Sequence, residues 1–290
     1  MVGARAGAGK NVGSCGWHEV ECSIATVPQP LIVTLGDVLA LVLVNPADGL
    51  PAESSAPSSS RLMVGGQAAV VACWAIETGA RARAISARSY DRAGDLVEAE
   101  LAERGVEMQG PGVEGATGVA TVIRAAGAHR TALTDRGVCP LLAAEALEPS
   151  WIEDADVLHV SGYALLEEPS AGAAERACEV ARDAGTPVCI DLACADIVTP
   201  LVRERIARLR PDIALATAAQ AEAIGGLDDL AAMAVVSDAN LTDAVDPMGV
   251  NDAYAAGFLC AIAAGVDPDD ARELGRQMAT RCARVEGPLP

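Results

Sequence analysis

The chain has 290 residues, of which 51% are hydrophobic, and its formal net charge at pH 7 is −19. This length and composition predict a folded protein with one large domain or two small ones. The acidic balance, with Lys10 as the one lysine of the sequence, argues against broad binding to nucleic acid or to an anionic membrane.

The nine cysteines are scattered and form no CxxC pair. This pattern is typical of buried thiols in a reducing compartment and argues against a zinc site. The longest apolar run, residues 253–266, is shorter than the roughly 20 residues that span a bilayer. The N-terminus lacks the continuous apolar stretch of a signal peptide. We therefore expect a cytoplasmic protein without a membrane partner.

Residues 1–28 are rich in Gly and Ala and show no sustained periodicity, so we expect a mobile N-terminal extension there and a folded domain over 29–290. Residues 3–11 resemble a phosphate loop only superficially. Ala4 stands where the first glycine belongs, and Asn11 stands where Ser or Thr should bind magnesium.

The folded part begins with an apolar strand at 31–35 that ends at Gly36-Asp37, and residues 38–44 could continue this strand or pair with it. Residues 45–61 are crowded with Pro, Ser, Gly and Asp, which predicts a loop or a reduced flap. Gly65-Gly66 then precedes an Ala-rich helix at 67–77.

The rest of the chain alternates between strand-like and helix-like stretches, which predicts an α/β fold with a mainly parallel sheet. We expect strands at 82–86, 157–161, 188–191 and 213–216, a hairpin of 119–124 and 130–134 around Gly127, and helices at 93–104, 170–184 and 218–224. A sheet of this kind binds ligands at the carboxyl ends of its strands.

The most informative feature is the turn Gly249-Val250-Asn251-Asp252, which opens the apolar run at 253–266. A helix that begins here offers free backbone N–H groups and its positive dipole end to an anion. Asp252 would place a carboxylate beside that anion. The pattern predicts a phosphate site with a base next to it, although a glycine turn with an aspartate cap would have the same sequence.

The order of several landmarks resembles the ribokinase-like (PfkB) family of sugar and nucleoside kinases over about residues 31–285. The landmarks are Gly36, Gly65-Gly66, Asp91 with Gly94, Thr117-Gly118, Arg136-Gly137, Asp191, and Asp246 ahead of the turn 249–252. The resemblance implies a three-layer α/β fold with a mainly parallel central sheet and helices on both faces. It also implies ATP-dependent phosphoryl transfer to a hydroxymethyl group, with ATP and Mg²⁺ as cofactors and a sugar or nucleoside as the partner.

Carried over residue by residue, the resemblance makes Asp252 the catalytic base and Gly249, Val250 and Asn251 the anion hole. Substrate contacts would come from Gly65, Gly66, Asp37 and Asp191, although a carboxylate in the position of Asp191 is also a common helix cap. Thr217, Gln220 and Asp246 would lie in the nucleotide and magnesium region, with no residue predicted as a direct metal ligand. The resemblance leaves a homodimer open.

The sequence departs from the family pattern where chemistry would occur. Asn251 replaces a glycine, and we expect it to tolerate a positive φ there. Leu41 and Val70 replace polar substrate contacts, and the neutral Gln220 replaces an acid that helps to organise magnesium. About twenty residues separate Gly226 from Asp246, where the family has several strands and its base pocket. We therefore expect a reduced lid and a shortened nucleotide-binding region.

Two functions agree with these observations. The first is a carbohydrate kinase whose turnover is weakened by the lost polar residues. The second is a catalytically inactive relative that binds a small anion or sugar, and a drifted reading frame is a third alternative. Cys194 has no base nearby in the sequence, and His159 and His129 lack ligand spacing, so we expect structural roles for all three.

Overall fold

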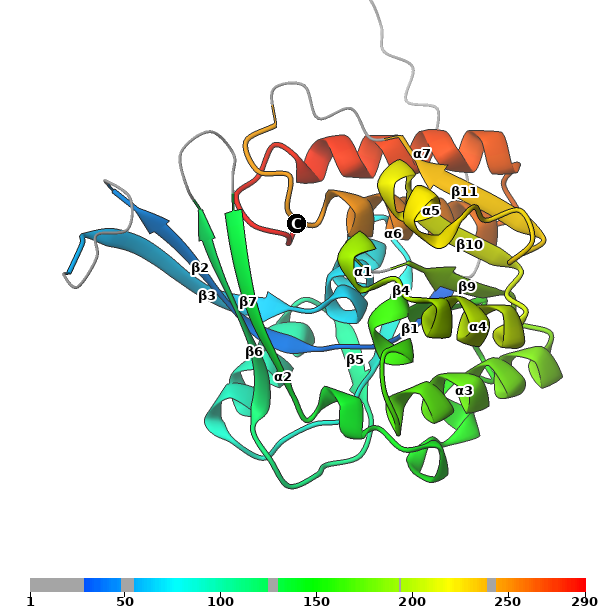
Figure 1. Cartoon of the computed structure of the whole chain (residues 1–290), viewed down its shortest axis with the longest axis horizontal. Coiled ribbons are helices and arrows are strands. Elements are labelled where there is room, and N and C mark those ends of the chain that lie inside the picture. Colours follow the sequence, from blue (N-terminus) through cyan, green and yellow to red (C-terminus); the bar gives the residue numbers. More distant parts are fainter. Residues whose placement is uncertain (1–28, 48–54, 125–129, 193, 239–243) are drawn as a thin grey trace, which may run out of the picture.

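The computed structural model describes residues 29–47, 55–124, 130–192, 194–238 and 244–290. The predicted N-terminal extension, the hairpin turn at Gly127 and His129 lie outside these ranges. A central sheet of seven strands has the order β11-β10-β9-β8-β1-β4-β5, and each neighbouring pair is parallel (Figure 1). Its strands are β1 (Leu31–Leu35), β4 (Arg81–Ile85), β5 (Val106–Gln109), β8 (Val157–Ser161), β9 (Val188–Asp191), β10 (Ile213–Thr217) and β11 (Met233–Ser237).

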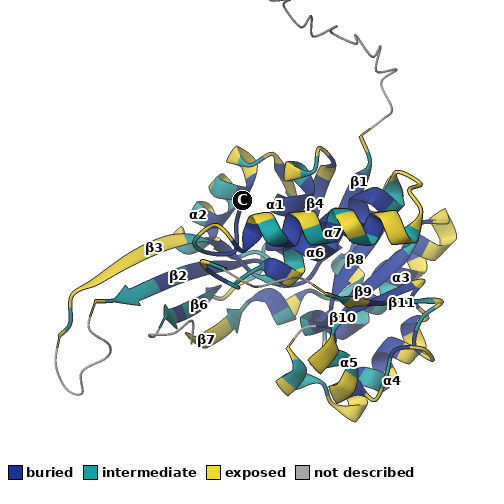
Figure 2. Ribbon diagram, turned by 90° about the horizontal axis from the view of Figure 1, so that it is seen from above, coloured by how far each residue is buried: buried dark blue, intermediate teal, exposed yellow. Residues whose placement is uncertain are grey.

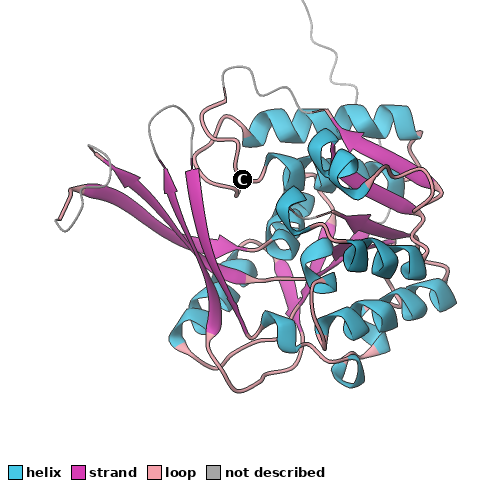
Figure 3. Ribbon diagram, viewed as in Figure 1, coloured by secondary structure: helices cyan, strands magenta, loops and turns pink. Residues whose placement is uncertain are grey.

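Helices cover both faces of this sheet, as the three-layer prediction required (Figure 3). One face packs against α1 (Gln67–Glu77), α2 (Arg92–Glu103), α6 (Val250–Ala263) and α7 (Pro268–Cys282). The other face packs against α3 (Ser170–Ala184), α4 (Pro200–Leu209) and α5 (Ala218–Ile224). Coverage on both sides explains why β1, β9 and β10 are nearly continuous apolar runs rather than alternating ones.

Helix α6 lies between α1, α7 and the sheet, and its residues 253–261 are all buried (Figure 2). A helix that is surrounded in this way is apolar on every side. That burial explains the apolar run in the sequence without a membrane. Across the residues that the model describes, every helix is too short or too polar to cross a bilayer.

A second sheet forms a lid that projects from the body of the molecule (Figure 1). Its strand order is β3-β2-β6-β7, with β2 (Leu39–Pro46), β3 (Ser58–Gly65), β6 (Thr117–Arg124) and β7 (Arg130–Gly137). The strands β6 and β7 form the predicted antiparallel hairpin. The stretch after β1 neither continues that strand nor pairs with it, because β2 pairs with β3 and β6 instead.

The prediction of a loop over 45–61 is wrong at both ends of that range. β2 extends to Pro46, and β3 begins at Ser58 and pairs with β2 in antiparallel register. Most of β3 is exposed, so burial left no apolar pattern in Ser58–Arg61 from which a strand could be read (Figure 2). Backbone pairing with the apolar β2 overrides the loop-like composition of this edge strand.

Candidate active site

The strand order changes direction at β1, which has β8 on one side and β4 on the other. Such a switch point leaves a crevice at the carboxyl ends of the strands, because the connections on its two sides diverge. Gly36 follows β1, and Asp191 ends β9. At Gly36, a β-carbon would lie 2.5 Å from Cβ of Ser161, so only glycine permits the two strand ends to approach so closely.

The N-terminus of α6 lies at the same edge of the sheet. Gly249 is in the left-handed region with φ of 78°, and the helix begins at Val250. The N–H groups of the first turn have no carbonyl partner within the helix, so they can bind an anion. We expected Asn251 to tolerate a positive φ. In the structure Asn251 is helical, and the residue with a positive φ in this turn is Gly249.

Asp252 lies in the first turn of α6 and is half-buried. Burial, followed by the negative charge of Asp191, raises the pKa of its carboxyl group to about 8, and Gln67 and Arg130 offset part of the rise. Repulsion between the carboxylates of Asp252 and Asp191 disfavours the state in which both are ionised. Asp252 is therefore a carboxyl group that can hold and release a proton near neutral pH.

Asp246 holds the turn before α6 against the C-terminal segment. It is buried, and its two carboxylate oxygens accept hydrogen bonds from the backbone of Met248 at 2.9 Å and of Gly287 at 3.1 Å. Pro288 then packs on Gly249, where a β-carbon would lie 2.7 Å from it. Asp246 thus fixes the turn before α6, and both of its carboxylate oxygens have hydrogen-bond partners within the chain.

Asp37 and the glycine pair form the floor beneath the lid. Both oxygens of Asp37 accept hydrogen bonds from Arg136 of β7, at 2.7 and 2.8 Å. Gly66 has φ of 91°, and a β-carbon there would lie 2.2 Å from the carbonyl oxygen of Asp37. A β-carbon at Gly65 would lie 2.8 Å from Cβ of Leu41. Asp37 was predicted as a substrate contact, and in the structure both of its carboxylate oxygens are hydrogen-bonded to Arg136.

Three residues of this region were not found from the sequence as site residues. Tyr163 follows β8, and the pKa of its hydroxyl is raised to about 12 by burial and then by Cys194, Asp252 and Asp37, which places the ring among these groups. Gln67, the first residue of α1, accepts a hydrogen bond from Ser161 and lowers the pKa of Asp252. His159 lies 3.6 Å from Asp191. These side chains come from β8, the turn after it and the start of α1, so the tertiary fold brings them together and no local sequence motif indicates it.

Comparison with known proteins decides the family. The model of the pfkB family carbohydrate kinases matches residues 29–239, which is more than half of the chain. The chain belongs to this kinase family. A comparison with functionally curated proteins found no match.

Solved structures of kinases have the same fold as this pfkB-family protein. Adenosine kinase from Sinorhizobium meliloti is 20% identical, with a TM-score of 0.76 and coverage of 90% of this chain and 96% of that chain. Fructokinase with bound ATP from Xylella fastidiosa is 17% identical, with a TM-score of 0.74 and coverage of 90% and 95%. Adenosine kinase from Schistosoma mansoni in complex with 2-fluoroadenosine is 14% identical, with a TM-score of 0.72 and coverage of 89% and 96%.

The two residues predicted for the nucleotide and magnesium region hydrogen-bond to each other. Thr217 and Gln220 cap α5 reciprocally: the backbone of Thr217 donates to Gln220 Oε1 at 2.6 Å, and the backbone of Gln220 donates to Thr217 Oγ1 at 3.3 Å. Within the described ranges, no group of three or more His, Cys, Asp or Glu residues could hold a metal ion. Between Gly226 and Asp246, the described residues include one strand, β11.

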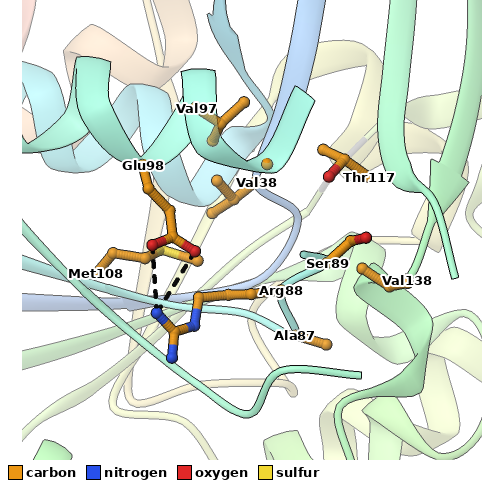
Figure 4. Close-up of a pocket in the computed structure, with 10 residues that line it drawn as sticks. Val38, Ala87, Arg88, Ser89, Val97, Glu98, Met108, Thr117 and Val138 are labelled. Atoms are coloured by element: carbon orange, nitrogen blue, oxygen red, sulfur yellow. Dashed lines mark hydrogen bonds and ion pairs between the residues drawn. The ribbon is translucent and has the colours of Figure 1, made fainter. Parts of the chain in front are cut away.

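A cavity of about 20 Å³ lies between α2 and the base of the lid (Figure 4). Arg88 and Glu98 form an ion pair at its wall with an N–O distance of 3.4 Å. Its size suits one water molecule and not a sugar.

The lid packs an apolar surface against Met248. This surface consists of Leu39, Leu41, Leu43, Ala120 and Val122.

Proposed function

We propose that this pfkB-family protein transfers a phosphoryl group from ATP to a hydroxymethyl group of a sugar, a nucleoside or a related small molecule. The observation that carries the proposal is Asp252, a carboxyl group in the first turn of α6, at the glycine turn where helix amides can bind phosphate. Its raised pKa means that the carboxyl group retains its proton up to near-neutral pH, where it can exchange it.

The chain's own groups would act in two ways. The amides of Val250, Asn251 and Asp252 would stabilise negative charge on the transferred phosphoryl group without reorganisation. The ionised carboxylate of Asp252 would accept the proton of the attacking hydroxyl. ATP would supply the phosphoryl group, and Mg²⁺ would neutralise charge on its phosphates.

The residues present fit the phosphates better than they fit the metal. The left-handed Gly249 and the first turn of α6, in which Asn251 is exposed, suit an anion. The neutral Gln220 is engaged in a helix cap, so Mg²⁺ would be held by phosphate oxygens and water rather than by this side chain.

A weakened reaction follows from the same groups. With a pKa of about 8, Asp252 is ionised in about a tenth of molecules at pH 7. Leu41 offers no hydrogen bond to a sugar hydroxyl, and Asp37 already accepts two from Arg136. If turnover is absent, these features support the second candidate, an inactive relative that binds an anion or sugar.

A coupled assay of ADP release tests the proposal with a panel of sugars and nucleosides, ATP and magnesium. We expect turnover with at least one acceptor, and a loss of about 10²-fold or more in Asp252→Asn. Asp269→Asn is the matched control, because Asp269 also lies in the first turn of a helix, is exposed, and should leave turnover unchanged.

Two outcomes would contradict the kinase proposal. One is no ADP release together with no thermal shift in the presence of ATP and magnesium. The other is full turnover in Asp252→Asn. ATP-dependent thermal stabilisation without ADP release would instead support the inactive, anion-binding alternative.

A further inference from the structure

A buried histidine and a buried carboxylate lie side by side beneath α6. His159 in β8 is 0% exposed, and Asp191 at the end of β9 is 3% exposed. His159 Nε2 lies 3.6 Å from Asp191 Oδ2. Among the described residues, neither ring nitrogen of His159 nor Oδ2 of Asp191 has a hydrogen-bond partner. Such unpaired buried polar atoms are costly, so the two groups should interact with each other.

Both side chains point to the face of the sheet that carries α6. In β8, His159 alternates with Leu158 and Val160, which pack with the helices of the opposite face. Its register neighbour Cys189 packs with the α1 and α6 face. The pair therefore lies on the side from which α6 presents Asp252.

The titratable groups around the imidazole can be named element by element. From β9 come Asp191 and Cys189, and burial followed by the charge of Asp191 raises the thiol pKa of Cys189 well above its ordinary value, so that it stays neutral. From α6 comes Asp252, and from the lid strand β7 comes the positive charge of Arg130, which reaches Asp252. On the β1 side the neighbour is Thr34, whose hydroxyl donates to Ala68 of α1, and α1 has no charged residue before Glu77.

Among the described groups named above, His159 is the one that can compensate the charge of Asp191 directly. An isolated buried carboxylate is strongly disfavoured, and a second carboxylate nearby makes its ionisation worse. Imidazole can take up a proton near neutral pH and donate it in a hydrogen bond. A small movement would bring the present 3.6 Å separation to hydrogen-bond distance.

We propose that His159 is a positioning residue for Asp252. Protonated on Nε2, it pairs with Asp191 and cancels the charge that would otherwise oppose ionisation of Asp252. The inference rests on the proposed function, because it assigns to His159 the task of keeping Asp252 available as a base. His159 would not touch the substrate, and its effect would pass through Asp191.

Turnover as a function of pH tests this role in the active enzyme. His159→Gln can still donate a hydrogen bond but cannot carry a charge, so the rising limb of kcat/KM should move to higher pH by about one unit. Asp191→Asn removes the carboxylate and leaves the imidazole neutral, so the net charge beside Asp252 is unchanged and the limb should stay near its wild-type pH. In the double variant, His159→Gln should cause no further shift. A limb that stays in place in His159→Gln, or a His159→Gln shift that persists in the double variant, would overturn the proposal.

A second measurement needs no turnover. The sequence has three histidines, so ¹⁵N-histidine labelling gives three ring systems, and His159 can be assigned by its absence from His159→Gln. At pH 7 we expect ring shifts of a doubly protonated imidazole in wild type and of a neutral one in Asp191→Asn. A neutral ring in wild type would overturn the inference. A protonated ring in a protein without ADP release would instead contradict the proposed function and leave the pair standing.

Discussion

Asp252 has a pKa of about 8 in the folded chain, whereas its ordinary value is 3.8. The unfolded chain therefore releases this proton from about pH 4 upward, and the folded chain retains it up to about pH 8. Stability falls as pH rises through this window, because the unfolded state binds fewer protons than the folded state. Above about pH 8 the penalty is constant. A group that lowers stability at neutral pH is typical of functional sites.

Replacement of Asp252 by Asn should therefore stabilise the protein while it abolishes turnover. The midpoint of thermal unfolding should rise at pH 7, by about 2–4 °C for each kcal/mol of relief. The gain should shrink toward pH 5, where less of the penalty has accumulated. Calorimetry of both proteins between pH 5 and pH 8 checks this, with Asp269→Asn as the control. An equal or lower midpoint in Asp252→Asn at pH 7 would contradict the buried, proton-holding state of Asp252.

Some residues of the site were predictable from local sequence and others were not. The turn from Gly249 to Asp252 was found because its glycine, its acid and the apolar run follow one another in the chain. Tyr163 and His159 were not assigned to the site, because sheet register, rather than sequence neighbours, sets their surroundings. Thr217 and Gln220 matched a family position, yet the structure engages both in a helix cap.

At the scale of elements, three lid strands converge on one glutamate of the C-terminal segment. Glu286 accepts a hydrogen bond from Asn45 of β2 at 2.8 Å and pairs with Arg61 of β3 at 2.9 Å and with Arg124 of β6 at 3.2 Å. Arg124 Nη1 also lies 3.8 Å from Oδ2 of Asp246, the residue that holds the turn before α6. An isolated exposed pair contributes little, but a shared acceptor couples the strands.

Glu286→Gln should loosen the lid without unfolding the domain. Amide hydrogen exchange should accelerate in β2 and β3, and the KM for the acceptor should rise more than kcat falls, because lid closure excludes water from the site. Glu179→Gln removes an exposed helix pair with Arg176 and serves as the control. Unchanged exchange in both lid strands would show that Glu286 does not hold the lid.

A second element-scale prediction concerns the glycine at the start of α1. Gly66 and Gly79 have similar φ values of 91° and 88°, but a β-carbon at Gly79 meets nothing within 4 Å. Gly79→Ala should cost about 1–2 kcal/mol from backbone strain alone. Gly66→Ala should cost more, about 3 kcal/mol or above, because the carbonyl of Asp37 must also move. Urea unfolding at 25 °C measures both, and equal losses would refute the close approach.

Buried elements were easier to predict from the sequence than exposed ones. The helix at 170–184 and the strand at 188–191 were predicted to the residue, because both carry strong patterns. The short strand β5 and the helix α4 were not predicted. Exposed residues dominate β3, and its pairing with β2 is not visible in its composition.

At the scale of the whole molecule, the parallel sheet makes one site from distant segments. The loops after β1, β8, β9 and β10 all open at the carboxyl edge, and α6 places its N-terminus there. The chain order alone indicated this α/β arrangement. The chain order could not indicate the charge balance of the site, which depends on how the half-buried Asp252 lies relative to the buried Asp191 and His159.

The central claim is that Asp252, at the amide-lined start of α6, is the base for phosphoryl transfer. Its most direct test is kcat/KM for the best acceptor, measured against pH with saturating ATP and magnesium. We predict a rise of about tenfold per pH unit up to about pH 8, a plateau above it, and no such limb in Asp252→Asn. A profile that is already flat from about pH 6, or an Asp252→Asn enzyme that keeps the wild-type limb, would contradict the claim.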